Sequence, residues 1–172
     1  MGKIRSISAF FCALALVSYV PCASAADLLS TPTLADLVVV VKSERKLYLM
    51  KAGQVLRAID IALGIFPKGP KRREGDFRTP EGRYTLEGRN PNSDYFLSIK
   101  ISYPSDADRA QAKKARVDPG GQIMIHGWPN EPHYDWGHYD GDWTDGCIGV
   151  RNADMVDIWL MTRESTPIEI RP

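Results

Sequence analysis

The segment Asp142–Met155, DWTDGCIGVRNADM, places a cysteine directly after a glycine and before a short apolar stretch. Residues 147–150 are apolar or small and are expected to form a short strand. Asn152 is a favourable helix N-cap, and Asp154 and Asp157 follow it in the early turns of a predicted helix. The segment therefore predicts a loop, a strand and a helix in succession, with Cys147 at the junction of loop and strand.

Outward from this segment, most of the chain has the alternating or β-branched patterns of strands. Between the strands lie long loops, and long loops in a compact β domain often carry function. We expect a mainly β, single-domain protein with one or two short helices, the first over residues 106–116. The expected strands cover residues 37–42, 47–50, 55–63, 82–86, 95–103, 122–126, 147–150 and 166–170.

The N-terminus has the pattern of a secretory signal peptide over residues 1–25. Lys3 and Arg5 precede an apolar run that is too short to span a membrane, and Ala23–Ala25 is a small-x-small cleavage pattern. Cleavage after Ala25 would leave a short leader, residues 26–36, and one domain, residues 37–172. The mature chain has no second long apolar run, so we expect an exported protein of the periplasm or cell envelope with no integral membrane segment.

The charge of the chain is nearly balanced. Of 22 basic residues, Lys3 and Arg5 belong to the predicted signal, which leaves 20 basic against 21 acidic residues. A nucleic-acid-binding domain would carry a clear basic excess, so nucleic acid is not an expected partner.

Cysteine usage is the strongest clue to chemistry. Cys12 and Cys22 lie in the predicted signal peptide, so Cys147 would be the only cysteine of the mature chain. A single cysteine in an exported protein indicates a reactive thiol or an intermolecular bridge. The alternative is a buried, inert cysteine that packs as a small apolar residue.

A nucleophilic cysteine needs a base, a group that orients the base, and donors for an oxyanion. His126 ends the apolar strand pattern IMIH, and the carbonyl of Gly127 could hold its imidazole. Gly146 would let a substrate approach the backbone, and the N–H groups of Asp145, Gly146 and Cys147 could line an oxyanion hole.

These residues resemble the signature of the L,D-transpeptidase (YkuD-type) catalytic domain, a His and a spacer followed by Ser/Thr-His-Gly-Cys. Here His126 is separated by seventeen residues from Thr144-Asp145-Gly146-Cys147. Upstream, EGDFRTPEGRYTL over Glu74–Leu86 is similar to the family's Thr-Pro-x-Gly-x-Tyr/Phe segment. The resemblance covers residues 37–172 and implies the β-sandwich or barrel-like fold of that family.

The resemblance also implies an activity on peptidoglycan peptide stems. Cys147 would attack the bond between meso-diaminopimelate and D-Ala, with His126 as proton donor and acceptor and the Gly127 carbonyl orienting it. The resulting thioester would pass to an amine, which gives a 3→3 crosslink, a link to a lipoprotein lysine, or an exchanged D-amino acid. No metal or other cofactor is implied, and carbapenems would acylate the thiol.

Two positions depart from the family pattern. Asp145 replaces the usual His, and an anion beside a thiol raises the thiol's pKa. Gly149 replaces a frequent Arg, so a substrate carboxylate would be bound elsewhere, by Arg151 or by the basic cluster Lys68–Arg73, whose simpler interpretation is a solvated loop. Further substrate-binding candidates are Thr144, Trp143 and Trp128.

The sequence leaves three competing hypotheses open. The Thr-Asp-Gly-Cys variant also resembles a subgroup that includes a hydrolase, which cuts peptidoglycan-linked lipoprotein with water as the resolving nucleophile. A metal site could use the cluster of histidines and aspartates at His126, His133, Asp135, His138, Asp140 and Asp142, although the spacing matches no known ligand pattern. A non-catalytic wall-binding module could use the aromatic residues Trp128, Tyr134, Trp136, Tyr139 and Trp143.

Overall fold

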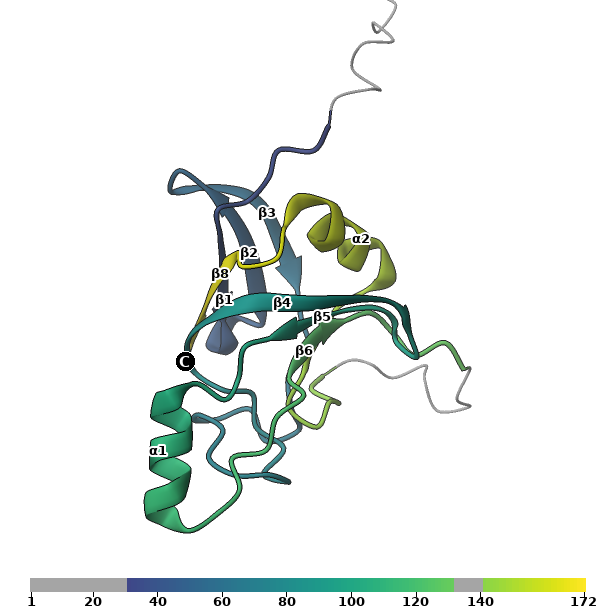
Figure 1. Cartoon of the computed structure of the whole chain (residues 1–172). Helices are drawn as coiled ribbons and strands as arrows, with labels where there is room; N and C mark the ends of the chain where they lie inside the picture. The colour runs from purple at the N-terminus through teal and green to yellow at the C-terminus, as the bar shows by residue number, and fades with distance from the viewer. Residues whose placement is uncertain (1–30, 132–140) are drawn as a thin grey trace, which may run out of the picture. The chain divides into compact units, whose positions relative to one another are not determined.

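One mixed β-sheet organises the part of the chain that the computed structural model describes, residues 31–131 and 141–172 (Figure 1). The strand order is β3-β2-β1-β8-β4-β5-β6-β7. Two pairs are parallel, β1 with β8 and β6 with β7. The strands are β1 Leu37–Val41, β2 Lys46–Lys51, β3 Gln54–Asp60, β4 Gly82–Ser93, β5 Phe96–Ile101, β6 Met124–His126, β7 Ile148–Gly149 and β8 Pro167–Arg171.

The two outer strands of this order meet. Just after β3, Ala62 exchanges two backbone hydrogen bonds with Gly149 of β7, at 2.8 and 2.9 Å. A second bridge joins Gly64 to Thr144. These bridges bring the segment after β3 to β7 and to the loop before Cys147. The expected mainly β fold is confirmed, and the meeting of its outer strands fits a barrel-like arrangement.

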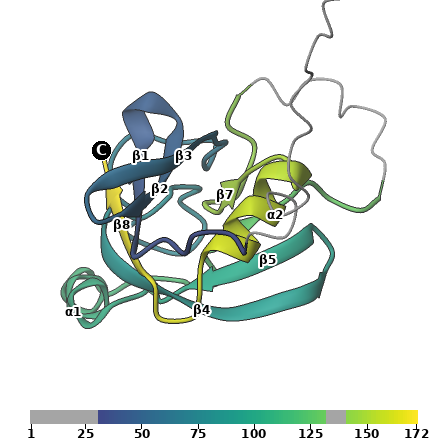
Figure 2. The same ribbon diagram turned by 90° about the horizontal axis from the view of Figure 1, so that it is seen from above.

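Two short helices accompany the sheet, α1 Asp106–Ala115 and α2 Asn152–Met161, besides a 3₁₀ turn at Lys42–Glu44. α1 begins with a capping box between Ser105 and Asp108. α2 lies over β5 in Figure 2 and buries Met155 and Ile158 against the core. Its N-cap is Arg151, not Asn152 as expected, because Asn152 already has helical backbone and its side chain accepts the N–H of Trp128 instead.

The core explains the β-branched and apolar patterns of the sequence. Leu49, Ile99, Ile125, Ile148 and Ile158 have no exposed surface. Burying each such side chain stabilises the fold by about 1.5–3 kcal/mol. Strands β6 and β7 are thus anchored by their apolar members, which fixes the positions of the polar residues beside them.

The largest difference from expectation is β4. The pattern predicts a short strand at residues 82–86, but β4 continues to Ser93 through Asn90, Pro91 and Asn92. Two register irregularities in its pairing with β5 accommodate the turn-forming residues. The extension carries the chain to the edge of the candidate site, where Ser93 and Tyr95 lie.

Several sequence predictions fall outside the described residues. They are the signal peptide at 1–25, its cleavage after Ala25, the beginning of the leader, and the aromatic and metal-ligand candidates between 132 and 140. The compact unit is Pro32–Pro172. Over the described ranges, no helix has the length and apolar character that a membrane span requires.

Candidate active site

Cys147 follows a tight turn that Thr144 holds together. The Thr144 hydroxyl donates to the Cys147 carbonyl at 2.7 Å and accepts the Gly146 N–H at 3.1 Å. Thr144 is buried, and its backbone pairs with Leu63 and Ile65. The hydroxyl of this predicted substrate-binding residue is therefore engaged by the turn, and it fixes the direction in which the chain presents Cys147.

Gly146 is required by its surroundings. Its φ is +128°, which favours glycine, and a Cβ there would lie 2.6 Å from the Arg78 carbonyl oxygen. The loop before β4 thus packs directly on the residue before the thiol. The N–H of Gly146 donates to Thr144, so it is not available to an oxyanion as the sequence suggested.

His126 lies at the end of β6 and is 5% exposed. Its Nδ1 lies 2.8 Å from the Gly127 carbonyl oxygen. A carbonyl only accepts, so Nδ1 carries the proton in this bond and Nε2 of the neutral ring is the acceptor. Burial lowers the pKa of His126, and the bond to Gly127 opposes that effect only in part. The ring is therefore neutral at pH 7 and able to take up a proton.

Two aromatic side chains enclose the imidazole. The Tyr95 ring centroid lies 4.6 Å from that of His126, and the Trp143 centroid lies 5.5 Å away in an edge-on arrangement. Tyr95 and Trp143 also stack on each other at 6.4 Å. These contacts limit the rotation of the ring and keep water from it. Tyr95 was missed in the sequence, because its loop is far from His126 along the chain and no local pattern marks it.

The thiol and the imidazole open on one cavity of about 290 Å³. The parallel pairing of β6 with β7 sets His126 beside Gly149, two residues after Cys147. A buried serine, Ser98 of β5, also lines this cavity. The lining is Ser93, Tyr95, Ser98, Gln122, Met124, His126, Trp143, Thr144, Asp145 and Cys147.

The thiol of Cys147 is partly buried and protonated at rest. It donates a hydrogen bond to the Gln122 carbonyl at 3.5 Å. Burial raises the pKa of Cys147, the backbone N–H of Met124 lowers it, and the carboxylate of Asp145 raises it again. The resting pair is thus a neutral thiol and a neutral imidazole, so the proton must move when the sulfur attacks.

The basic cluster Lys68–Arg73 is not simply a solvated loop. Lys71 is buried, and its ammonium pairs with Asp76 at 2.9 Å. The Asp76 carboxylate also accepts the backbone N–H groups of Arg72, Arg73 and Arg78. This arrangement shapes the loop whose Arg78 carbonyl contacts Gly146, so Lys71 and Asp76 support the site structurally.

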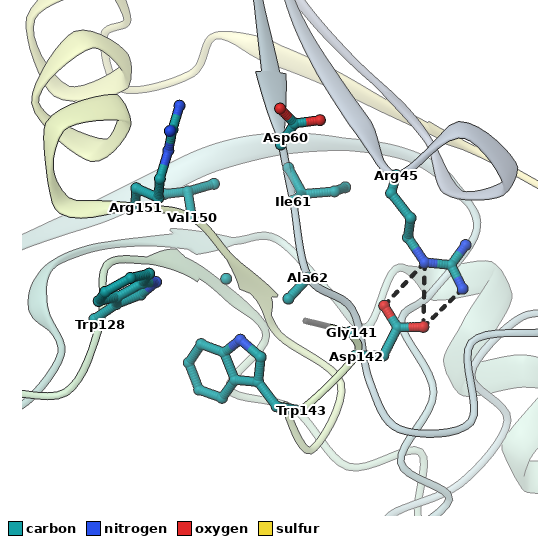
Figure 3. Close-up of a pocket in the computed structure, with 11 residues that line it drawn as sticks. Arg45, Asp60, Ile61, Ala62, Trp128, Gly141, Asp142, Trp143, Val150 and Arg151 are labelled. Atoms are coloured by element: carbon teal, nitrogen blue, oxygen red, sulfur yellow. Dashed lines mark hydrogen bonds and ion pairs between the residues drawn. The ribbon is translucent and has the colours of Figure 1, made fainter. Parts of the chain in front are cut away.

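A second cavity, of about 400 Å³, shares Trp143 with the first (Figure 3). Trp128 and Arg151, both predicted as substrate-binding candidates, lie on this second cavity and not on the one that holds the thiol. Asp142 is held there by Arg45, whose Nη2 lies 2.7 Å from its carboxylate. Trp143 is therefore the predicted residue that the structure places on both cavities.

Two of the six candidate metal ligands, His126 and Asp142, lie among the described residues. No group of three or more His, Cys, Asp or Glu side chains in residues 31–131 and 141–172 is arranged to hold an ion. Asp142, one of the candidate ligands, is bound to Arg45 and to the N–H of Leu63. Its carboxylate is thus already neutralised by a guanidinium.

Comparison with known proteins identifies the family and the fold of this chain. YafK of Escherichia coli (strain K12), an L,D-transpeptidase candidate by name, is 39% identical over 61 residues, 34% of this chain and 23% of that protein. The helical cell shape determining protein Pgp2 from Campylobacter jejuni is 26% identical with a TM-score of 0.58 over 78% of this chain and 46% of its own. Bd1075 of Bdellovibrio bacteriovorus is 25% identical with a TM-score of 0.53 over 80% of this chain and 48% of its own.

The chain thus spans less than half the length of each of these relatives. Their full activities therefore do not transfer to it directly. The family model of the YkuD L,D-transpeptidase catalytic domain, however, matches residues 35–170, nearly all of the described unit. The chain belongs to the YkuD family of L,D-transpeptidase catalytic domains.

Proposed function

We propose that this protein is a cysteine-dependent L,D-transpeptidase that acts on peptidoglycan peptide stems, with Cys147 as nucleophile and His126 as base. The observation that carries the proposal is one cavity that holds a partly exposed thiol and a buried imidazole with Nδ1 bound to the Gly127 carbonyl. That bond leaves Nε2 as proton acceptor, which is what attack by a neutral thiol needs.

In the first step, Sγ of Cys147 attacks the carbonyl between meso-diaminopimelate and D-Ala, and Nε2 of His126 takes the thiol proton. The carbonyl oxygen becomes an oxyanion. Because the Gly146 N–H is used by Thr144, we assign its stabilisation to the N–H groups of Asp145 and Cys147. The imidazolium then protonates the departing D-Ala nitrogen, which leaves a thioester on Cys147 and a neutral imidazole.

In the second step, an amine attacks the thioester carbonyl and loses its proton to His126. The bond between the carbonyl carbon and Sγ then breaks, and the imidazolium returns the proton to the leaving thiolate of Cys147. When the amine belongs to a second stem, the product is a 3→3 crosslink. A lipoprotein lysine or a free D-amino acid would attack the thioester in the same way. Asp145 lines the cavity and is exposed, so its carboxylate can attract the cationic acceptor before the amine is deprotonated.

Hydrolysis is the second candidate function, and it is favoured by the presence of Asp145 at the thiol cavity. A carboxylate on the thiol cavity can accept a proton from water in addition to His126. Water would then resolve the thioester, as in a hydrolase that releases peptidoglycan-linked lipoprotein.

The test incubates the chain without residues 1–25, and its Cys147→Ala variant, with disaccharide-tetrapeptide and with lipoprotein-linked muropeptides. Products are identified by mass spectrometry. Dimers that have lost D-Ala, absent with the variant, establish the transpeptidase. Tripeptide or released lipoprotein without dimers establishes the hydrolase, and unchanged turnover by Cys147→Ala rejects both.

Two controls distinguish this enzyme from a metal-dependent protein and from a wall-binding module. Activity that persists in EDTA argues against a metal site, since a thiol mechanism needs no ion. Loss of Cys147 reactivity toward iodoacetamide in His126→Ala indicates a catalytic pair, whereas a wall-binding module would show binding without turnover. Fractionation of cells tests the expected export to the periplasm or cell envelope.

A further inference from the structure

The second cavity lies where the outer strands of the sheet meet. Its floor is formed by Ala62 and Gly149, which are bridged through their backbones. A side chain at Gly149 would collide with Trp143, because a Cβ there would lie 2.7 Å from the indole. The glycine therefore leaves room for the indole of Trp143, which lines both the thiol cavity and this one. Figure 3 shows this indole at the second cavity.

The charges around the second cavity balance. Arg45 is paired with Asp142, Asp60 with Lys46 at 2.6 Å, and Arg151 with Asp154 at 2.8 Å. A cavity that selected an anion or a cation would present an excess of one sign. This one offers both hydrogen-bond donors, on Arg45 and Arg151, and acceptors, on Asp60 and Asp142, which suits an uncharged ligand rich in hydroxyl and amide groups.

The walls supply flat apolar surface as well. Trp128 is 40% exposed, and its backbone is fixed because its N–H donates to the Asn152 side chain at 2.8 Å. Ile61 and Val150 are further apolar residues of the lining. Aromatic faces with polar groups at the rim are suited to a pyranose ring, whose C–H face packs on an indole while its hydroxyls bond to the rim.

The distance from Cys147 to the second cavity matches the length of a peptide stem that ends in a sugar. Gly149 comes two residues after Cys147, which is about 7 Å along a strand. A donor stem has three residues between the attacked carbonyl and the sugar that carries it, and three extended residues reach about 10 Å. A stem that is bound at Cys147 can therefore place its own sugar on the far side of Trp143.

We propose that the second cavity binds an N-acetylated amino-sugar ring of the glycan to which the donor stem is attached. The inference rests on the proposed function for the identity of the donor. It makes Trp128 and Arg151 specificity residues for the sugar and not for the peptide.

The test compares kcat/KM for disaccharide-tetrapeptide with kcat/KM for the same tetrapeptide without sugars. We expect the ratio of the two to fall about tenfold in Arg151→Ala and in Trp128→Ala, from the loss of a charge-assisted hydrogen bond or of stacking. Arg57→Ala is the matched control. Like Arg151, Arg57 is an exposed arginine paired with an aspartate of α2, Asp157, but it lies outside the cavity, so its ratio should not change.

A second measurement does not depend on turnover. The uncharged disaccharide di-N-acetylchitobiose, built of N-acetylated amino sugars, is titrated into ¹⁵N-labelled Cys147→Ala protein, and the indole N–H signals are followed by NMR. We expect the Trp128 signal to shift, with weaker binding in the Arg151→Ala background. If wild type turns over neither substrate, the proposed function fails while this titration still decides the sugar site.

Two results would overturn the inference. One is a ratio of the two kcat/KM values that stays at the wild-type value in both cavity variants. If both variants lose the same factor in kcat/KM on the two substrates, the ratio is also unchanged, and the cavity contacts the peptide instead of the sugar. The other is a Trp128 signal that does not respond to the disaccharide.

Discussion

Gly146→Ala tests how the loop before β4 holds the thiol. The added Cβ would lie 2.6 Å from the Arg78 carbonyl oxygen and 3.4 Å from Ile123 Cδ1. Arg78 cannot easily retreat, because its N–H donates to Asp76, whose carboxylate is paired with the buried Lys71. The substitution therefore forces the turn that carries Cys147 to move.

The magnitude has two parts. A non-glycine residue at a φ of +128° is strained by about 1–3 kcal/mol. Overpacking against fixed backbone adds about 1–3 kcal/mol. We expect the free energy of unfolding to fall by about 2–6 kcal/mol. Gly53→Ala is the control, since Gly53 also has a positive φ, +78°, but a Cβ there meets nothing within 4 Å. Its cost should be only about 1–2 kcal/mol.

The assays are urea unfolding and the rate of Cys147 acylation by disaccharide-tetrapeptide. For Gly146→Ala we expect acylation to slow by about 10²-fold under conditions where the variant is folded, because a displacement of about 1 Å is enough for that loss. Gly53→Ala should acylate at the wild-type rate. If Gly146→Ala is no less stable than Gly53→Ala and acylates normally, the proposed packing of Arg78 on Gly146 is wrong.

Three further predictions concern charge and protonation. Lys42→Met should lower the free energy of unfolding, measured in urea, by about 3–5 kcal/mol, because the removed ammonium is buried against Glu81. Lys51→Met, which breaks an exposed pair with Asp36, should lower it by at most about 1 kcal/mol, and equal losses in the two variants would contradict this reasoning. Asp145→Asn should lower the pKa of Cys147, because the carboxylate raises it. The rate of alkylation by iodoacetamide, measured against pH, should then rise at lower pH than in wild type, and an unshifted profile would mean that the carboxylate does not act on the thiol. Tyr95→Ala should hydrate His126 and raise its lowered pKa. We expect the acid limb of kcat/KM below the ordinary histidine pKa of 6.5 in wild type and at higher pH in the variant; an unmoved limb would show that Tyr95 does not shield the ring.

The features that were predictable from sequence are those encoded locally. β1 is a run of valines, and such β-branched residues favour a strand whatever segments lie beside them. The helix expected over residues 106–116 is found as α1, Asp106–Ala115. Cys147 and His126 were found because their types and spacing resemble the family signature, and both line one cavity. Their catalytic roles remain predictions.

The features that were missed depend on pairing between distant segments. β4 runs through Asn90–Asn92 because β5 pairs with it, although those residues alone favour a turn. The parallel pairing of β6 with β7 brings Met124 next to the thiol, and no local pattern announces a parallel pair. Tyr95 reaches His126 only through the β4–β5 connection, so the aromatic enclosure of the base could not be read from the chain.

The central claim is that Cys147 forms the thioester. The most direct measurement mixes the chain without residues 1–25 with disaccharide-tetrapeptide, quenches with acid within the first turnover, and maps the protein by peptide mass spectrometry. The account predicts that the peptide containing Cys147 gains the mass of the donor less D-Ala, and that His126→Ala accumulates this adduct far more slowly. Products formed at the wild-type rate by Cys147→Ala, or an adduct on any other residue, would contradict it.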